Sequence, residues 1–353
     1  MPTPHVVALP AAGISLEEKL ACLRAPSCYP QFVSNIETIE THMSWVFLTN
    51  ENAYKLKKPI RHDIFDFRAI EARRHFCEEE VRLNRRLAED VYLAVVPLCR
   101  IASGELRLES AGEAIDWLVK MRRLPAERML DRMIANGTAR PQDIVRVAQT
   151  LAEFYKQSHR LAIEPRIRRA VLMSETRRNR RVLSRAAYQL PADQVRRLCD
   201  WHRSMLRSSP AWLEERLRGM HIVEGHGDLR PEHVCIRERI DIIDCLEAAP
   251  HLRLLDPADE VGYLALEIER LGAPAFSSLL LQTWREASGD APDQRLVHFY
   301  QSLRACIRAR LAAQHLDEAW ERDREKWMTR TFDYLGLAER HQASASAVSD
   351  PPS

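Results

Sequence analysis

The sequence lacks long apolar runs and the marks of a secreted chain. No stretch of about eighteen apolar residues, the length that a membrane-spanning helix requires, occurs in its 353 residues. The first residues, Met1 to His5, lack the charged and apolar regions of a signal peptide. We therefore expect a cytoplasmic protein without a membrane segment.

The chain also lacks an excess of charge of either sign and closely paired cysteines. Its 52 Lys and Arg face 50 Asp and Glu, so a formal net charge of +2 gives no overall field toward nucleic acid or a membrane surface. We expect neither as a partner. The eight cysteines include no CxxC pair, and most lie among apolar residues, where a reduced thiol packs as a small hydrophobe. We expect neither zinc nor disulfides.

What the chain has is a strand-rich first third and a mostly helical remainder. A hydrophobic fraction of 46% suffices for a large core, and the length suggests two lobes. Ser15 and Glu18 form a capping box that begins a short helix, which should end before Pro26. The patterns further predict two strands within 36–50, strands at 53–57, 92–99, 105–109 and 114–119, and a helix over 70–88. Beyond Pro125 long helical patterns dominate, and the small, polar segment 341–353 predicts a disordered tail.

Two acidic residues, Asp228 and Asp244, occupy positions that suggest chemistry. Asp228 follows His226 and Gly227 and precedes Pro231, so it lies in a loop whose backbone angles Gly and Pro restrict. Residues 234–236 and 240–243 predict a hairpin that ends at Asp244, 244 − 228 = 16 residues later. Such a hairpin can bring both carboxylates to one cleft. One would act as a base or positioning group and the other as a metal ligand, as phosphoryl transfer requires.

Longer motifs make this hypothesis specific. The segments His226-Gly227-Asp228-Leu229 and 243–247 (Ile-Asp-Cys-Leu-Glu), together with segments 40–49, 53–59 and 74–87, resemble the aminoglycoside phosphotransferase-like family, relatives of protein kinases. They are most similar to a bacterial branch in which some members carry an additional P-loop ATPase domain, whose GxxxxGK[ST] motif this chain lacks. The resemblance covers roughly residues 35–335.

The resemblance implies an α+β, bilobal protein kinase-like fold, with an antiparallel-sheet N-lobe that holds one main helix and a mostly helical C-lobe. It places an N-terminal helical extension at 1–34, the N-lobe at 35–115 and the C-lobe at 116–340. The C-lobe would hold a catalytic loop at 226–233 and a metal loop at 244–247.

Residue by residue, the resemblance implies that Asp228 is the catalytic base and that Asp244 holds the metal. Lys55 would bind the nucleotide phosphates, and Ala53 would face adenine. Glu80 would form an ion pair with Lys55, and Glu79 is the alternative to Glu80. Strand alternation places Ala53, Lys55 and Lys57 on one face. In the helix, the spacing of Glu80 from apolar neighbours directs it inward.

Other positions depart from the family pattern or are assigned more loosely. The segment 114–119 would form the hinge that binds adenine, with Trp117 packed nearby. The turn 41–44 contains no glycine, so Ser44 and backbone N–H groups would have to cover the phosphates. The family has Asn where this chain has His233, a weaker ligand for magnesium than an amide oxygen. Glu260 replaces an Asp that braces the catalytic loop.

Together these residues predict a phosphotransferase that uses ATP (or GTP) and Mg²⁺ or Mn²⁺ to phosphorylate a hydroxyl of a small molecule. The alternative is a catalytically impaired kinase-like module that binds a nucleotide or a partner protein. A third hypothesis makes His226, Asp228 and His233 ligands of a transition-metal hydrolase, although their spacing matches no metal motif. Without a functional role, Asp228 would cap a loop, Lys55 and Glu80 would be solvated, and His233 would be a buried histidine bound to backbone.

The sequence also suggests the charge of the acceptor. Few acids accompany the arginines at 166, 168, 169, 177, 178, 180, 181 and 185, in the segment where this fold places part of its substrate-side surface. Clustered guanidinium groups recognise phosphate or carboxylate. We therefore expect a neutral or anionic acceptor and no aminoglycoside. The alternative is a solvated basic helix.

Overall fold

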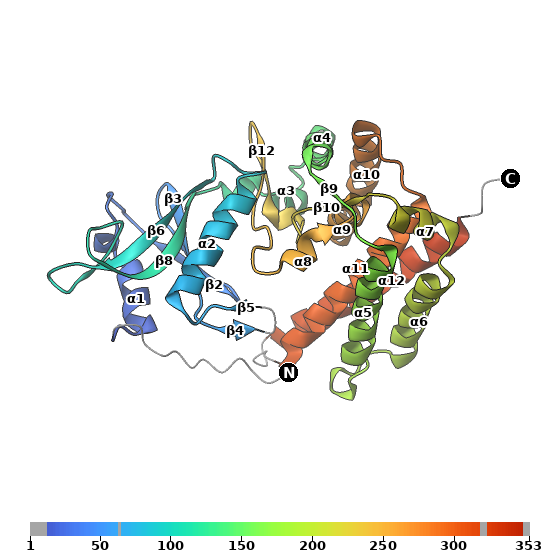
Figure 1. The fold of residues 1–353 in the computed structure, drawn as a ribbon, viewed down its shortest axis with the longest axis horizontal. Coiled ribbons are helices and arrows are strands. Elements are labelled where there is room, and N and C mark those ends of the chain that lie inside the picture. Colours follow the sequence, from blue (N-terminus) through green and yellow to red (C-terminus); the bar gives the residue numbers. More distant parts are fainter. Residues whose placement is uncertain (1–12, 63–64, 318–322, 349–353) are drawn as a thin grey trace. The chain divides into compact units, whose positions relative to one another are not determined.

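The structure is a computed structural model that describes residues 13–62, 65–317 and 323–348 (Figure 1). The chain forms two compact units. The sheet unit comprises residues 1–129 and 233–252, and the helical unit comprises residues 130–232 and 253–353. The architecture is the expected one, an antiparallel sheet with one main helix in the first unit and a mostly helical second unit.

The sheet unit is built on a six-stranded antiparallel sheet with strand order β1-β2-β3-β8-β6-β7. Strands β2 and β8 flank β3, so that Lys55 of β3 pairs with Val46 on one side and Val119 on the other. Two short hairpins, β4-β5 and β11-β12, complete the strands of this unit. The elements are α1 (Leu16–Leu23), η1 (Pro26–Cys28), β1 (Glu37–Glu40), β2 (Ser44–Leu48), β3 (Asn52–Lys57), β4 (Arg61–His62), β5 (Phe65–Asp66), α2 (Ile70–Asn84), β6 (Tyr92–Arg100), β7 (Leu106–Leu108), β8 (Glu113–Arg122), η2 (Ala126–Arg128), β11 (Val234–Ile236) and β12 (Ile240–Ile242).

Helices cover both faces of the large sheet. The α1 side chains Leu20 and Leu23 pack with Tyr54 and Leu56 of β3 in one apolar cluster. On the other face, α2 packs against β6 and β8, and Ala53 belongs to that cluster (Figure 1). The period of two along β3 therefore separates Tyr54 and Leu56 from Ala53, as the sequence predicts.

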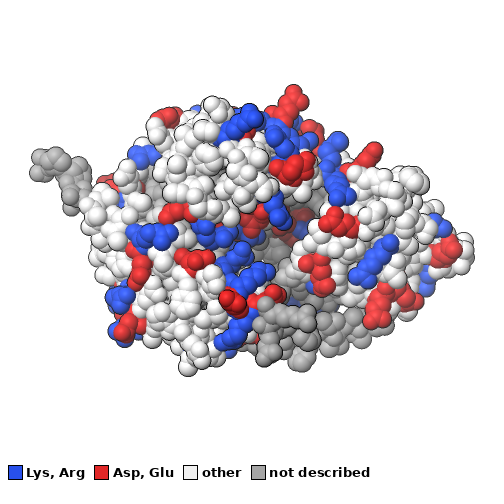
Figure 2. All heavy atoms as spheres, turned by 180° about the vertical axis from the view of Figure 1, so that it is seen from behind, with Lys and Arg blue, Asp and Glu red and all other residues white. Residues whose placement is uncertain are grey.

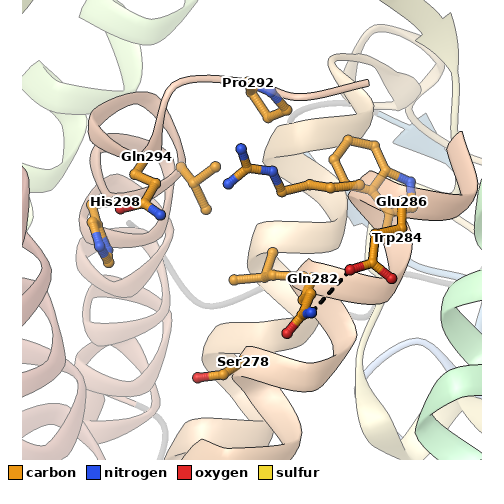
Figure 3. Close-up of a pocket in the computed structure, with 10 residues that line it drawn as sticks. Ser278, Gln282, Trp284, Glu286, Pro292, Gln294 and His298 are labelled. Atoms are coloured by element: carbon orange, nitrogen blue, oxygen red, sulfur yellow. Dashed lines mark hydrogen bonds between the residues drawn. The ribbon is translucent and has the colours of Figure 1, made fainter. Parts of the chain in front are cut away.

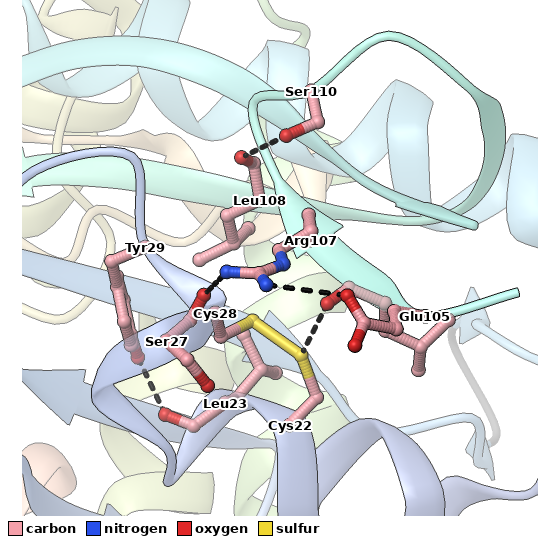
Figure 4. The surroundings of a disulfide bond; sticks show 10 residues. Cys22, Leu23, Ser27, Cys28, Tyr29, Glu105, Arg107, Leu108 and Ser110 are labelled. Atoms are coloured by element: carbon pink, nitrogen blue, oxygen red, sulfur yellow. Dashed lines mark hydrogen bonds and ion pairs between the residues drawn. A yellow bond between two sulfur atoms is a disulfide. The ribbon is translucent and has the colours of Figure 1, made fainter. Parts of the chain in front are cut away.

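The expectation that the chain has no disulfide is wrong. Cys22 and Cys28 form a disulfide with Cα atoms 5.6 Å apart, within the usual range for such a bond (Figure 4). The capping box of Ser15 and Glu18 begins α1 as predicted. After α1 the chain reverses at Pro26 into η1, which returns the second cysteine to the first. A search for CxxC pairs misses a bridge that depends on this reversal.

The helical unit consists of packed helices and one small sheet. Its elements are α3 (Leu130–Ala135), α4 (Pro141–Gln157), β9 (Arg160–Leu161), α5 (Pro165–Leu183), η3 (Ala186–Tyr188), α6 (Ala192–Ser208), α7 (Ala211–Arg218), β10 (Ile222–Glu224), η4 (Pro231–His233, which ends in the sheet unit), α8 (Pro250–Arg253, which spans the boundary), β13 (Leu254–Leu255), α9 (Pro257–Arg270), α10 (Pro274–Ser288), α11 (Gln294–Gln314), η5 (His315–Asp317) and α12 (Arg324–Ala347). Side chains of α5, α6, α9, α11 and α12 form its main core, in which Tyr263 and Tyr334 are buried. The sheet β13-β10-β9 leads the chain into residues 225–230.

Several expected boundaries differ from the observed ones. Strand β8 continues through residue 115 to Arg122, because its backbone pairs with β3 and β6 along this length, and the sheet unit extends to residue 129. Most of the described part of the expected disordered tail is helical, since α12 extends to Ala347 and Ala345 is buried. Residues 349–353 lie outside the described part of the chain.

Within the described ranges, we find no helix that combines the length and the apolar character needed to cross a membrane. On the face in Figure 2, Lys and Arg side chains are interspersed with Asp and Glu side chains.

Candidate active site

Lys55 is the centre of an ionic network in the sheet unit. Its Nζ lies 2.8 Å from Glu80 Oε1 and 2.7 Å from Asp244 Oδ1. Three segments far apart in sequence, β3, α2 and the residues after β12, thus meet at one amine. The expected pairing of Lys55 with Glu80 is present, and Glu79 instead binds Arg82.

The local sequence explains why these side chains meet. Glu80 lies one turn of helix from Asn84 and three residues from Cys77, and all three are buried on the face of α2 toward the sheet. Glu80 is 0% exposed, so its carboxylate requires ionic partners, which β3 supplies. The exposed-helix alternative for Glu80 is therefore excluded.

A second lysine, Lys57, completes the network. Its Nζ lies 2.6 Å from Glu80 Oε2 and 2.5 Å from Glu247 Oε1, and its side chain is 1% exposed. The two lysines and three carboxylates form the chain Asp244-Lys55-Glu80-Lys57-Glu247. Sequence reasoning placed Lys57 on the correct face but gave no role to Lys57 or Glu247. The signal for this network in the sequence was that two lysines lie on one strand face and that one Glu was expected to point inward.

The network keeps both amines charged. Burial lowers the pKa of Lys55, but Asp244, Glu80 and Glu247 raise it more, and the result lies well above the ordinary value. The pKa of Lys57 is raised in the same way by Glu247 and Glu80 against the effect of burial. Burial raises the pKa of Glu80, while Lys55 and Lys57 lower it below its ordinary value. Lys55, whose side chain is 14% exposed, therefore carries a positive charge that can bind an anion.

The segment after β12 is held in an unusual conformation. Asp244 has φ = 63°, in the left-handed region that non-glycine residues seldom adopt. Its N–H donates to the Tyr92 hydroxyl oxygen at 3.0 Å, and the Cys245 N–H donates to Asn84 Oδ1 at 2.9 Å. Asn84 in turn donates to the Glu80 carbonyl at 2.8 Å. Helix α2 therefore positions both the partner of Lys55 and the backbone that presents Asp244.

Asp244 can act as the main protein ligand of a nucleotide-bound cation. Its side chain is 46% exposed, although Lys55 occupies one oxygen, and His233 Nε2 lies 3.6 Å from the other. No group of three or more His, Cys, Asp or Glu that could hold a metal occurs among the described residues. This donor set fits Mg²⁺, which proteins often bind through one or two carboxylates together with substrate phosphates. The contact with Asp244 favours a site role for His233, whose backbone carbonyl also accepts the Ile243 N–H.

In the helical unit, Glu260 braces the loop that carries Asp228. Its buried carboxylate accepts the N–H groups of His226 and Gly227 and the hydroxyl of Tyr155. Gly225 permits this approach, because a Cβ there would lie 2.4 Å from Glu260 Oε2. Burial raises the pKa of Glu260, which the hydrogen bonds only partly oppose. Glu260 thus holds this loop in the place where the resemblance leads us to expect a bracing Asp.

Asp228 itself is held by two side chains. Arg230 donates to its Oδ2 through Nε at 3.0 Å, and the Tyr263 hydroxyl donates to its Oδ1 at 3.1 Å. Burial raises the pKa of Tyr263 well above its ordinary value, so the phenol stays a donor. Sequence reasoning missed Arg230 and Tyr263. Arg230 was visible two residues after Asp228, whereas Tyr263 is reached only through the packing of α9.

The remaining predicted residues lie in the sheet. Ala53 is buried beneath α2, and Ser44 begins β2 with its N–H donated to the Thr41 hydroxyl. Trp117 is half-buried in β8 with the Arg74 guanidinium 4.5 Å from its ring centre. The backbone of 114–119 pairs with β6, and part of it also with β3, so this segment is not a free hinge. The chain leaves the sheet only after Arg122.

A separate pocket of about 520 Å³ lies between α10 and α11 of the helical unit (Figure 3). Trp284, Pro292 and Val297 form apolar parts of its lining, and Gln282 donates to Glu286 at its wall. None of the residues that line it belongs to the loop of Asp228. We assign it no role in the site.

Comparison with known proteins gives relatives of similar sequence. No family model matches the chain. Protein Rv2004c of Mycobacterium tuberculosis (strain H37Rv) and protein Mb2027c of Mycobacterium bovis are each 28% identical to it over 279 residues, 78% of this chain. The chain spans 54% of the length of these relatives.

Solved structures show the fold. A choline/ethanolamine kinase family protein from Mesorhizobium loti superposes with a TM-score of 0.55 at 15% identity, covering 93% of this chain and 99% of that one. Choline kinase from Cryptosporidium parvum gives 0.51 at 11% identity over 89% and 91% of the two chains. A thermostable mutant of aminoglycoside phosphotransferase APH(4)-Ia gives 0.50 at 12% identity over 90% and 97%. The chain has the phosphotransferase-like, protein kinase-like fold that its motifs predict.

Proposed function

We propose that this protein transfers the γ-phosphoryl group of ATP (or GTP) to a hydroxyl of a small molecule. The observation that carries the proposal is the bridge that Lys55 makes between buried Glu80 and exposed Asp244. A structural ion pair would satisfy Glu80 alone. The bridge instead presents the Lys55 amine and the carboxylate of Asp244, a residue with a strained backbone conformation. Phosphoryl transfer uses an amine to bind phosphate and a carboxylate to hold the metal.

Each residue has a distinct task in this reaction. Lys55 binds phosphate oxygens of the nucleotide, and Glu80 holds its amine in place. Asp244, with His233 beside it, would hold Mg²⁺ or Mn²⁺, which neutralises charge on the phosphates. Asp228 accepts the proton of the acceptor hydroxyl, whose oxygen forms a bond to the γ-phosphorus as the bond to the nucleoside diphosphate breaks. Arg230, through Nε and Nη2 at Oδ2, and Tyr263, through its hydroxyl at Oδ1, orient Asp228.

A second candidate is an impaired kinase-like module that binds a nucleotide without transferring phosphate. His233 in place of an amide ligand, and the tight, glycine-free turn that Thr41 closes onto Ser44, favour it. Both functions require neither nucleic acid nor a membrane, and we place both in the cytoplasm.

The test compares nucleotide binding with turnover in the purified chain. We expect saturable binding of ADP or GDP in the presence of Mg²⁺ or Mn²⁺, and formation of ADP from ATP that increases when an acceptor is added. Asp228→Asn is the matched control and should bind nucleotide without turnover. Binding with no turnover in any acceptor pool would support the impaired module, and no nucleotide binding at all would exclude both. Stoichiometric tightly bound zinc or iron would instead favour the hydrolase.

A further inference from the structure

The helical unit holds two arginines that are fixed at one end and open at the other. Arg270 of α9 donates through Nε to Glu267 Oε2 at 2.8 Å, and Arg308 of α11 lies with Nε 3.3 Å from Glu267 Oε1. The Tyr334 hydroxyl donates to both oxygens of the same carboxylate, at 2.7 and 2.9 Å. Glu267 is 1% exposed, so it is an internal anchor and not a surface acid. We call Arg270 and Arg308 the guanidinium pair.

The free ends of the guanidinium pair are hydrogen-bond donors. In the described part of the chain, the terminal amino groups of both arginines contact no acceptor within hydrogen-bond distance. Their side chains are 14% and 17% exposed. Each guanidinium also lies over the Tyr334 ring, at 5.5 and 5.6 Å, which restricts its orientation. Two preorganised forks with unused donors suit a phosphate or carboxylate.

The pair lies near the loop of Asp228. On α9, Tyr263, Glu267 and Arg270 follow one another at spacings of four and three residues, which places them along one helix face. The Tyr263 hydroxyl donates to Asp228, and the Arg304 guanidinium, one turn before Arg308 on α11, lies 5.1 Å from the centre of the Tyr263 ring. The other arginines nearby are occupied: Arg230 binds Asp228 and Glu232, and Arg304 binds Asp259 with two of its nitrogens.

We propose that the guanidinium pair binds an anionic group, phosphate or carboxylate, of the acceptor whose hydroxyl is phosphorylated at Asp228. The inference rests on the proposed function and adds the substrate class to it. The acceptor is a hydroxylated anion, such as a sugar phosphate or a hydroxy acid. It excludes cationic acceptors of the aminoglycoside or choline type, because a cation would meet the open ends of two arginines.

The test measures binding of matched probes to the full chain with its nucleotide site saturated by ADP and Mg²⁺. The probes are glycerol 3-phosphate and glycerate as anions, glycerol as the neutral compound and glucosamine as a cation, each titrated by calorimetry. We expect saturable binding of at least one anion and none of glycerol or glucosamine. Arg308→Gln should weaken anion binding roughly tenfold or more, the loss expected for one charged hydrogen bond.

Control variants separate binding from folding. Arg207→Gln removes the same charge from an exposed position of α6, outside the arginine-rich segment 166–185, and should leave anion affinity unchanged. Arg308→Lys should recover part of the affinity, since it keeps the charge without the fork. Because the loss of the Arg308 Nε contact can destabilise the unit, Arg270→Gln serves as a second variant, and ADP affinity and thermal unfolding are measured on every protein.

Each outcome decides the question. If ADP does not bind the wild type, the proposed function fails whatever the anions do. If ADP binds and ATP turns over, this inference alone is overturned by any of three results. These are no saturable anion binding at millimolar concentration, equal anion affinity in the wild type and in well-folded Arg308→Gln and Arg270→Gln, or binding of glucosamine in preference to the anions. A loss of ADP affinity that equals the loss of anion affinity in Arg308→Gln would show that the pair serves the nucleotide instead.

Discussion

Lys55 and Lys57 occupy neighbouring places in one network, yet the structure predicts opposite consequences when each is replaced by methionine. Lys57→Met removes the cation shared by Glu80, which is 0% exposed and keeps Lys55, and Glu247, which is only 13% exposed. Lys55→Met leaves Asp244, which is 46% exposed and can be hydrated, while Glu80 keeps Lys57. Lys57 should therefore matter more for stability and Lys55 more for nucleotide binding.

The burial of the carboxylate partners of each lysine determines how much unfolding free energy its substitution costs. Removal of one member of a buried ion pair costs about 3–5 kcal/mol because the remaining charge stays desolvated, and this range applies to Lys57→Met. For Lys55→Met water replaces the amine at Asp244, so we expect about 1–3 kcal/mol, the range for loss of a charged hydrogen bond. Against a total of about 5–15 kcal/mol for a folded domain, the first value leaves little margin.

Urea unfolding and ADP titration of the same proteins provide the assay. Lys57→Met should have the lower unfolding midpoint and, below its melting temperature, retain ADP binding. Lys55→Met should unfold closer to the wild type and lose ADP affinity. The double variant Lys57→Met with Glu247→Gln also removes the charge of Glu247, which loses Lys57 in the single variant, and should recover part of the stability.

One pattern of results would refute this reasoning. If Lys55→Met were the less stable variant, and folded Lys57→Met were the one that lost ADP, then Lys57 would bind the phosphates and Lys55 would be the internal brace. Equal losses of unfolding free energy in both variants would show that hydration of the Asp244 carboxylate does not compensate for the loss of Lys55.

Three further predictions concern single side chains. Asp228→Asn should abolish transfer with nucleotide affinity nearly unchanged, whereas Asp244→Asn should also lose metal-dependent nucleotide binding; retained activity in both, with wild-type affinities, would defeat the assignment. His233→Asn restores an amide oxygen and should shift the metal preference in turnover assays from Mn²⁺ toward Mg²⁺; an unchanged ranking would mean that His233 is no ligand. Burial lowers the pKa of His202 from its ordinary 6.5 to about 3. Below pH 6.5 the unfolded chain therefore binds a proton at His202 that the folded chain does not bind, which lowers stability by about 2 kcal/mol at pH 5. In urea unfolding, acidification to this pH should therefore lower the stability of the wild type by about that amount more than the stability of His202→Gln.

The fold could be predicted where local pattern decides it. The capping box at Ser15, the individual strands of the sheet unit and the hairpin before Asp244 can each be recognised within a short segment, although the pairing of β3 with β8 joins distant segments. Prediction from the sequence failed where the path of the chain, or packing against other segments, determines the structure. The bridge of Cys22 to Cys28 needs the chain reversal at Pro26, and α12 extends into a polar segment because Ala345 and its neighbours find a surface to pack on.

The candidate site divides in the same way. The resemblance paired Lys55 with Glu80, while alternation along β3 and the helical register of Glu80 gave the face of each, and the structure shows the two side chains 2.8 Å apart. Tyr92 and Tyr263 escaped notice because no periodicity connects a tyrosine in β6 to Asp244 or one in α9 to Asp228. A hydrogen bond between two elements far apart in sequence produces no recognisable pattern in the sequence of either element.

The arginines of α5 show why charge in a sequence window is a weak guide to a binding surface. Few acids lie within residues 164–185, so the window suggested unpaired cations. In the structure six of the eight arginines form ion pairs, and four of the six partner acids come from elsewhere in the chain, in the pairs Arg168–Asp259, Arg169–Glu214, Arg180–Asp200 and Arg185–Asp317, with Arg166–Glu164 and Arg178–Glu175 local. Those six have little capacity left for a ligand. Arg270 and Arg308 lie in helices of mixed charge and do not stand out in the sequence. Glu267 and Tyr334 fix their Nε ends, and among the described residues no acceptor lies within hydrogen-bond distance of their terminal donors. The number of unused donors near Asp228, and not the local density of positive charge, is therefore the better guide to which acceptor this protein binds.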